Sequence, residues 1–246
     1  MKFGVKNYDN EKFFNYLKDK ADFIETMAIQ GRDYSFLKDF PVPVVIHAEH
    51  QAFGINPADL SKREENLNSI NFAKKIADLT GAKKIIVHPG IIKNGNKNCS
   101  MKNAVAFFKE IKDDRILVEN LFENEYGVLN GEGLCGTPWK TKRFLKKTGV
   151  GFCFDINHAI AGMKDFKENY NFIRRYLKLN PAHYHIGGQK KKVSVFHLYF
   201  KDSELDLKKI LSYYPKDIEI TLETGTDEKI MEEDLETIRK VVGELS

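Results

Sequence analysis

The chain has 246 residues, of which 42% are hydrophobic and 30% charged, as expected of a globular protein with a sizeable core. No apolar run approaches the roughly 20 residues that cross a bilayer, and the N-terminal segment turns polar too early for a signal peptide, so we expect a cytoplasmic protein without a membrane partner. The net charge of +4 permits a phosphate-rich partner but does not require one. Three widely spaced cysteines without a C-x-x-C pair indicate neither a disulfide framework nor a cysteine-rich zinc site.

Short apolar runs alternate with helical patterns along the whole chain. Apolar residues recur at i, i+3, i+4 and i+7 from Ala104 and again from Leu207, which predicts amphipathic helices. Thr137 and Pro138 are typical of a helix start and Gly149 of a helix end, and a further amphipathic segment closes the chain. The predicted strands are residues 2–6, 22–28, 42–48, 84–90, 116–122, 151–158, 182–188 and 218–225.

Eight strands with helical segments between most of them predict a parallel sheet. Eight such units in about 250 residues are the size of one α/β domain of the (β/α)8 TIM barrel type, and we expect a single domain over residues 1–246. A doubly wound open sheet is the alternative. It would normally carry a G-x-G-x-x-G loop after an early strand, and the sequence contains none.

Acidic and histidine side chains recur at or just beyond the carboxyl ends of the predicted strands. In a barrel these ends converge on one face, where active sites are built. His197 lies on the connection after the seventh strand. The side chains at the strand ends are Glu25, His47, His88, Glu119, Asp155, His158, His185 and Glu223.

A metal site explains this pattern better than separate structural roles do. One histidine or carboxylate at a strand end is more often a satisfied polar residue or a helix cap, and we expect that role for His50 and His183. Several carboxylates at one barrel mouth repel each other, however, and no arginine stands at a strand end to neutralise them. A divalent cation resolves the conflict because it binds carboxylate and neutral imidazole together.

The motifs resemble those of the xylose isomerase-like barrels and, within them, the family 2 apurinic endonucleases (endonuclease IV). The most specific segment is GFCFDINHAIAG, residues 151–162, which resembles the family signature G-x-C-hydrophobic-D-T-C-H-x-x-x-A-G. The segments VIHA, VHPG, VENLFENEYG and TLETG resemble its other ligand-bearing strands. The resemblance extends over most of the chain, from Gly31 to Gly225, and implies the same barrel fold.

The resemblance also implies two or three metal ions in the barrel mouth. Zinc suits the many imidazoles best, with manganese, magnesium or cobalt as alternatives. The aspartate that normally completes the third position is Val195 here. The implied ligands are His47, His88 and Glu119 for the first metal, Glu119, Asp155, His185 and Glu223 for the second, and His158 and His197 for the third.

The implied activity is phosphodiester hydrolysis in DNA at abasic sites by a metal-activated hydroxide, with Glu119 and Glu223 as catalytic residues. Abasic-site DNA is then the expected partner, and no feature indicates an obligate protein partner. Three consecutive lysines after the seventh strand are candidate DNA contacts, although a solvated lysine surface is an equal interpretation. These are Lys190, Lys191 and Lys192.

A sugar isomerase or epimerase on the same barrel is the main alternative. Such an enzyme needs one metal, and Glu119 and Glu223 would move a proton at carbon while His158 binds the substrate. Val195 and the absence of the family's Tyr-Leu wedge after His47 favour this alternative, whereas the two additional histidines, at positions 47 and 88, favour the nuclease. A non-catalytic descendant would show eroded ligands, and only the third-site aspartate is missing.

Overall fold

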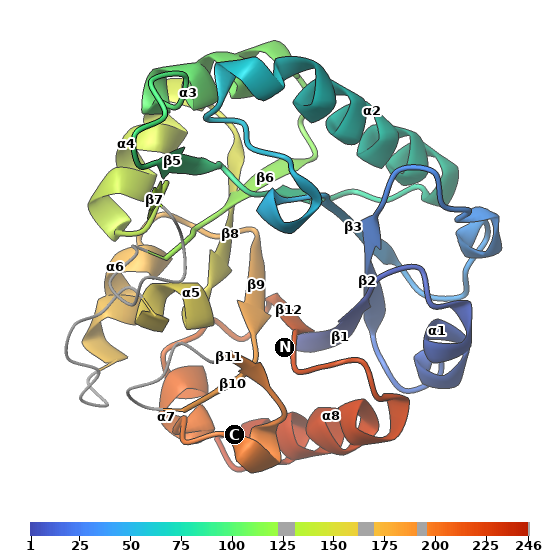
Figure 1. Ribbon diagram of the computed structural model, residues 1–246. Coiled ribbons are helices and arrows are strands. Elements are labelled where there is room, and N and C mark those ends of the chain that lie inside the picture. Colours follow the sequence, from blue (N-terminus) through green and yellow to red (C-terminus); the bar gives the residue numbers. More distant parts are fainter. Residues whose placement is uncertain (123–130, 162–169, 191–195, 246) are drawn as a thin grey trace.

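The computed structural model describes residues 1–122, 131–161, 170–190 and 196–245. Within these residues, eight parallel strands close into a barrel, and their order around the ring follows the chain (Figure 1). This arrangement confirms the predicted TIM barrel. The barrel strands are β1 (Lys2–Asn7), β2 (Phe23–Ala28), β3 (Val44–Ala48), β4 (Ile85–Val87), β6 (Ile116–Glu119), β8 (Gly151–Asp155), β9 (His183–Ile186) and β12 (Glu219–Leu222).

Most predicted strands contain the observed one, but several observed strands end up to three residues earlier than predicted. The run 151–158 does not continue as a strand, because β8 ends at Asp155 and helix α5 begins at Ile156. Asp155 Oδ1 accepts a hydrogen bond of 2.6 Å from the backbone N–H of His158, as a capping side chain does. The carboxylate that ends the strand therefore also starts the helix.

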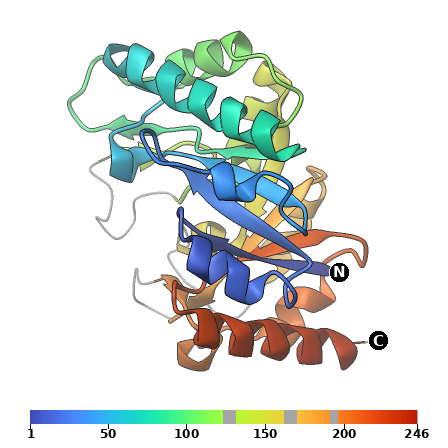
Figure 2. The same cartoon turned by 90° about the vertical axis from the view of Figure 1, so that its right-hand side faces the viewer.

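Helices surround the barrel and cover the outer face of its strands (Figures 1 and 2). The start and end predicted for α4 are confirmed, since Thr137 Oγ1 accepts from the Lys140 N–H at 3.2 Å and Gly149 is left-handed with φ of 77°. The connection from β2 to β3 holds the 3-10 turn η1 (Ser35–Leu37) in place of an α-helix. The helices are α1 (Glu11–Leu17), α2 (Arg63–Thr80), α3 (Met101–Glu110), α4 (Pro138–Thr148), α5 (Ile156–Ala161), α6 (Ile173–Leu177), α7 (Leu207–Ser212) and α8 (Glu228–Gly243).

Two antiparallel ribbons are formed in the described part of the chain by loops that follow barrel strands. One pairs β5 (Ile91–Lys93) with β7 (Gly131–Gly133), and the other pairs β10 (Gly188–Gln189) with β11 (Phe196–Leu198). Both lie beyond the carboxyl ends of the strands, so they border the barrel mouth. Among the described residues, no helix is both long and apolar enough to cross a membrane.

The barrel interior contains two rings of side chains, because residues two apart on a strand point to the same face. The lower layer is mostly apolar, and the ring of Phe23 fills the space above Gly4, where a Cβ would lie 2.2 Å from it. The upper layer, nearer the carboxyl ends, is entirely polar. The lower layer is Gly4, Phe23, Val45, Ile86, Leu117, Cys153, His183 and Thr221. The upper layer is Lys6, Glu25, His47, His88, Glu119, Asp155, His185 and Glu223.

Candidate metal centre

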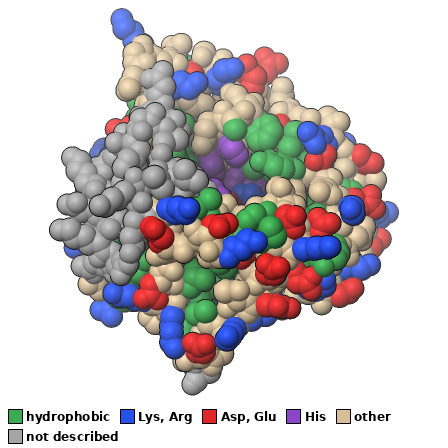
Figure 3. Space-filling model, turned by 60° about the horizontal axis from the view of Figure 1, so that its bottom comes forward, with side chains coloured by type: hydrophobic (Ala, Val, Ile, Leu, Met, Phe, Trp, Pro, Cys, Tyr) green, Lys and Arg blue, Asp and Glu red, His purple; other side chains and the backbone are tan. Residues whose placement is uncertain are grey.

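The polar upper layer is the floor of a cavity of about 420 Å³ in the barrel mouth. Histidine side chains are visible at the bottom of a hollow in the molecular surface, beside apolar side chains (Figure 3). The ligands predicted from the sequence meet here, although they come from several different strands and connections. The cavity wall includes Lys6, Tyr8, Met27, Phe122 and Gly225.

The first group of potential ligands is His47, His88 and Glu119. The Nε2 atoms of His47 and His88 lie 3.2 and 3.3 Å from Glu119 Oε2. The Nδ1 atom of His47 donates to the Ala48 carbonyl at 2.7 Å, and that of His88 lies 3.0 Å from Gln51 Oε1. These partners direct both Nε2 atoms at the carboxylate.

A cation between these three side chains satisfies their electrostatics. Burial lowers the pKa of His88 to about 4, against the opposing effect of Glu119, so the ring is neutral at pH 7. When His88 Nδ1 carries the proton and donates it to Gln51 Oε1, the lone pair of Nε2 points toward Glu119 Oε2. Two acceptors 3.3 Å apart repel each other unless a positive charge lies between them. A histidine held through its other nitrogen is also the usual form of a metal ligand.

The second group is Glu119, Asp155 and His185, so Glu119 belongs to both groups. His185 Nδ1 lies 3.5 Å from Glu119 Oε2 and 2.8 Å from Glu223 Oε1. Asp155 Oδ2 is buried and accepts no hydrogen bond from any residue that the structure describes. A buried carboxylate oxygen without a donor is the atom that a metal ion would satisfy.

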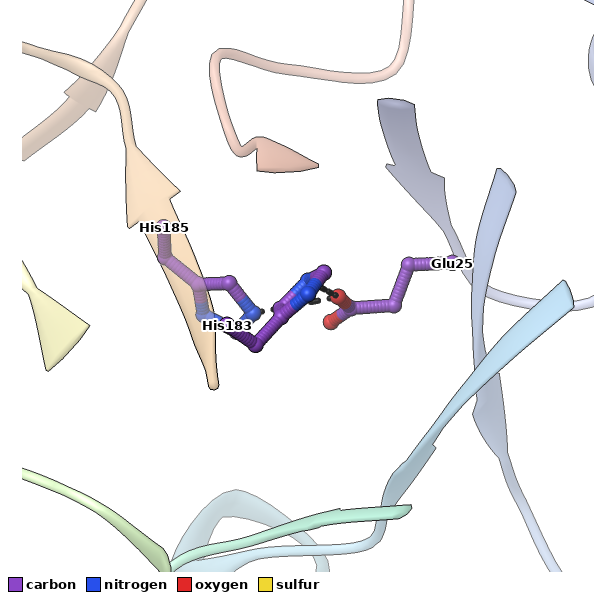
Figure 4. Close-up of side chains that lie close together, drawn as sticks. All are labelled: Glu25, His183 and His185. Atoms are coloured by element: carbon purple, nitrogen blue, oxygen red, sulfur yellow. Dashed lines mark hydrogen bonds and ion pairs between the residues drawn. The ribbon is translucent and has the colours of Figure 1, made fainter. Parts of the chain in front are cut away.

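Glu25 holds His185 from the opposite side (Figure 4). His185 Nε2 lies 3.0 Å from Glu25 Oε2, which also accepts from Thr221 Oγ1 at 2.8 Å. His183 Nε2 lies 3.3 Å from the same oxygen. A proton on His185 Nε2 leaves Nδ1 as the free lone pair that faces Glu119. Glu25 is therefore placed to orient His185 if this ring binds a metal ion.

The third group is Asp155, His158 and His197. His158 Nδ1 lies 2.9 Å from Glu119 Oε1, and His197 Nδ1 lies 3.4 Å from Glu223 Oε2. Burial alone would lower the pKa of His158, but Asp155 and Glu119 raise it to about 9. Without a metal ion, the His158 imidazole is thus protonated at pH 7. Val195, which stands at the expected third-site aspartate, lies outside the described residues.

Lys6 is the residue of the upper layer that the sequence analysis missed. Its Nζ atom lies 2.5 Å from Glu223 Oε1 and 3.3 Å from Glu25 Oε1. Burial would raise the pKa of Glu223, but Lys6 and His185 hold it well below its ordinary value. No arginine stands at a strand end, and Lys6 provides the countercharge instead. Lys6 lies two residues after Gly4 on β1, and this spacing places it in the layer.

The two remaining histidines have different positions. His183 is a polar core residue in the lower layer, with Nε2 2.8 Å from Thr221 Oγ1 and Nδ1 3.2 Å from Lys84 Nζ. His50 lies at the cavity, where its ring stacks on His88 with centroids 4.9 Å apart. It therefore borders the first ligand group, which the sequence pattern did not indicate.

The predicted DNA contacts are only partly described by the structure. Lys190 follows β10 and is exposed beside the barrel mouth. Lys191 and Lys192 lie outside the described residues. All three remain predictions.

Comparison with known proteins identifies the family. A family model described as xylose isomerase-like TIM barrel matches residues 15–241. The chain belongs to this family. No curated protein sequence gives a significant match. The resemblance proposed from the sequence motifs is thereby confirmed for the barrel family.

Solved structures similar to this chain include two described as nucleases and one described as epimerase-like. Endonuclease IV from Thermus thermophilus has a TM-score of 0.76 and 16% identity, with 99% of this chain and 100% of that chain covered. A D-tagatose 3-epimerase-like protein has a TM-score of 0.70 and 20% identity, with 98% of this chain and 100% of that chain covered. A family 2 AP endonuclease from Brucella melitensis has a TM-score of 0.65 and 16% identity, with 94% of this chain and 97% of that chain covered. Similarity at these identities establishes the fold, and the reaction must be inferred from the site.

Replacing Glu25 tests its effect on His185. We expect Glu25→Gln to weaken zinc affinity about 10- to 100-fold, because the amide no longer fixes the His185 proton on Nε2. Affinity is measured by competition with a chromogenic chelator. The matched control is Glu219→Gln, which removes a carboxylate paired with Lys84 at 2.7 Å at the opposite end of the barrel. Equal affinities for the two variants would contradict the orienting role.

Zinc affinity should also depend on pH. Since the pKa of His158 is raised to about 9 in the metal-free protein, zinc must displace a proton from this ring at lower pH. Apparent affinity should therefore rise about tenfold per pH unit between about 6 and 9 for this proton. Chelator competition at several pH values measures the slope. An unchanged slope in His158→Ala would show that this proton is not displaced.

Proposed function

We propose that this protein is a metal-dependent phosphodiesterase that cleaves DNA at abasic sites, with zinc as the favoured metal. The observation that carries the proposal is the group of His47, His88 and Glu119. It lies directly beside the Glu119, Asp155 and His185 group, and Glu119 is common to both. A one-metal sugar enzyme does not need the first group, whereas hydrolysis of a phosphodiester uses adjacent metal sites.

The chemistry follows from the donor set. Divalent ions bound in adjacent groups would activate a water molecule and stabilise charge on the attacking and leaving oxygens. Imidazole nitrogens and carboxylates together favour zinc over magnesium. Glu119 would bind the metal ions of both groups, while Glu25 would orient His185 through its Nε2 atom. Glu119 and Glu223 are our candidates for catalytic residues, because Glu119 is common to two of the candidate ligand groups and Glu223 lines the cavity.

The barrel mouth has features that suit a nucleic-acid substrate. The cavity of about 420 Å³ is large enough for a sugar and its phosphate, and apolar side chains line one side of it. Tyr8 and Phe53 are partly exposed, with ring centroids 6.4 Å apart. Aromatic rings at the entrance can stack on bases or cover a sugar face. Lys190 at the rim adds positive charge toward phosphate. Endonuclease IV from Thermus thermophilus shares the barrel fold, so the fold is compatible with this reaction.

A sugar isomerase or epimerase is the second candidate. Glu119, Asp155, His185 and Glu223 would form its single-metal shell, with Glu119 and Glu223 moving the proton. The cavity volume also fits one monosaccharide, and a D-tagatose 3-epimerase-like protein shares the fold. This function leaves His47 and His88 without a role, although both are buried and aimed at Glu119. We therefore favour the nuclease.

Variants of the first group separate the two functions. Glu119→Gln should lower cleavage of an abasic duplex about 1,000-fold or more, and His88→Ala about 100-fold or more, because each removes a ligand needed for phosphate chemistry. His50→Ala is the matched control, since His50 contacts His88 but is not in the ligand group. Cleavage is followed on a labelled duplex with one abasic site, against an intact duplex. If His88→Ala retains full activity on a sugar and the wild-type protein leaves abasic DNA intact, the isomerase is correct.

The lysines after β10 should contribute to DNA affinity. Reversing charge at Lys190, Lys191 and Lys192 should weaken binding and reduce the slope of log affinity against log salt by up to about 0.9 per lost duplex phosphate contact. Fluorescence anisotropy over a salt series measures both effects. The control reverses Lys146 and Lys147, which are exposed on the last turn of α4, at the opposite end of the barrel. Equal effects in both variants would dismiss a specific role for the loop.

A further inference from the structure

His197 reaches the third ligand group from an irregular position in the ribbon of β10 and β11 (Figure 1). Gly188 pairs with Leu198, and Gln189 pairs with Phe196. The register therefore shifts by one residue, and His197 is the extra residue of β11. Its φ of 63° is left-handed, a conformation that residues with a side chain rarely adopt. A bulge of this kind turns a side chain away from the direction of regular pairing, so the position of His197 depends on what holds the ribbon.

The backbone of Gly187, directly before this ribbon, packs against His197. A Cβ atom on Gly187 would lie 3.1 Å from His197 Cα and 2.6 Å from the carbonyl oxygen of Glu223. His197 Nδ1 in turn lies 3.1 Å from the same carbonyl oxygen. The backbones of Gly187 and Glu223 thus form the surface on which the histidine rests. A shift of Gly187 would therefore displace the imidazole.

Asn157 holds the backbone of Gly187 with both ends of its side-chain amide. Its Oδ1 atom accepts from the Gly187 N–H at 2.7 Å, and its Nδ2 atom donates to the Gly187 carbonyl at 3.0 Å. Nδ2 also lies 3.3 Å from Oε1 of Gln189, which is part of β10. Asn157 is fully buried on α5 and directly precedes His158. The clamp therefore ties the helix that carries His158 to the ribbon that carries His197.

This contact requires an amide and is repeated elsewhere in the centre. Asn120 holds Asp155 in the same way, since its Nδ2 donates to the Asp155 carbonyl at 2.8 Å and its Oδ1 accepts from the Asp155 N–H at 2.9 Å. An amide side chain offers the donor and acceptor of a peptide unit, so each contact extends the strand pairing beyond a strand end. The family signature has cysteine at position 157, and a thiol cannot bind both groups of a peptide.

We propose that Asn157 is a positioning residue, which clamps Gly187 and so holds His197 in the bulge that brings its imidazole to Asp155 and His158. The inference rests on the proposed metal-dependent function, because it concerns how the third ligand group is assembled. The support acts through the backbone, whereas that of Glu25 acts on the imidazole of a histidine directly. Loss of the clamp releases the ribbon and moves His197 away from the group.

Histidine labelling with diethyl pyrocarbonate, mapped by peptide mass spectrometry, tests the position of His197 in the full chain without added metal. Asn157→Ala removes both contacts with Gly187, and we expect its His197 to be labelled about tenfold faster than in the wild-type protein. His183 is fully buried in the lower layer and reports general unfolding, so its labelling should not change. Unchanged labelling of His197, or an equal rise at His183, would overturn the inference.

Asn66→Ala is the matched control. Asn66 is also buried and makes the same paired contact with the backbone of Asn56, at 2.8 and 2.9 Å. It lies on α2, which follows β3, and β3 stands opposite β9 in the barrel. We therefore expect wild-type labelling of His197 in this variant. A rise equal to that in Asn157→Ala would show a general effect of lost hydrogen bonds and would also overturn the inference.

Protection by zinc connects the position of His197 to the metal and can be measured on the wild-type chain if Asn157→Ala does not fold. We expect zinc chloride to protect His197 from labelling, and Asn157→Ala to need about 10- to 100-fold more zinc for half protection. A wild-type His197 that zinc leaves unprotected would overturn the inference. Labelling requires no DNA. A chain that shows the expected protection but leaves abasic DNA intact would refute the proposed function alone.

Discussion

The burial of four carboxylates in one ring of the barrel is the constraint on which the rest of the structure depends. Carboxylates removed from water at this spacing repel each other strongly, and each must find positive charge or hydrogen-bond donors. Lys6 serves Glu25 and Glu223. The protonated His158 ring serves Glu119 Oε1, and Asp155 keeps an oxygen without a donor among the described residues. The layer is thus arranged around cations that the chain itself only partly provides.

The layer below makes this arrangement rigid. Five apolar side chains fill most of the lower ring, and the Phe23 ring packs over Gly4 and against His183, with centroids 5.5 Å apart. Thr221 and His183 of this lower ring contact the Glu25 carboxylate in the upper ring. Lys84 contacts the other nitrogen of His183, at the end of the barrel away from the cavity. A close-packed floor limits how far a ligand carboxylate can move when a metal binds. The selectivity and geometry of a bound metal ion would therefore depend also on residues that do not touch it.

The same barrel supports both phosphodiesterases and sugar isomerases, and the upper layer determines which chemistry is possible. His47 and His88 add a second candidate metal group beside the group of Asp155 and His185, and Glu119 is common to both groups. Lys6 adds an ammonium group that pairs with Glu25 and Glu223. Together these residues define a centre with fixed positive charge beside its metal positions. Such a centre is suited to an anionic substrate.

The sequence alone determined the barrel and most of its site. Alternating strands and helices predicted the fold, and the strand ends marked the histidines and carboxylates, because the carboxyl ends of parallel barrel strands always meet on one face. It placed Asp155 at a strand end but did not predict that this carboxylate also caps the helix that follows, since one carboxylate serves either role. Only the tertiary structure placed Lys6 between Glu25 and Glu223 and His50 on His88. Those contacts cross the barrel between distant segments, and local sequence patterns carry no record of which side chains meet there.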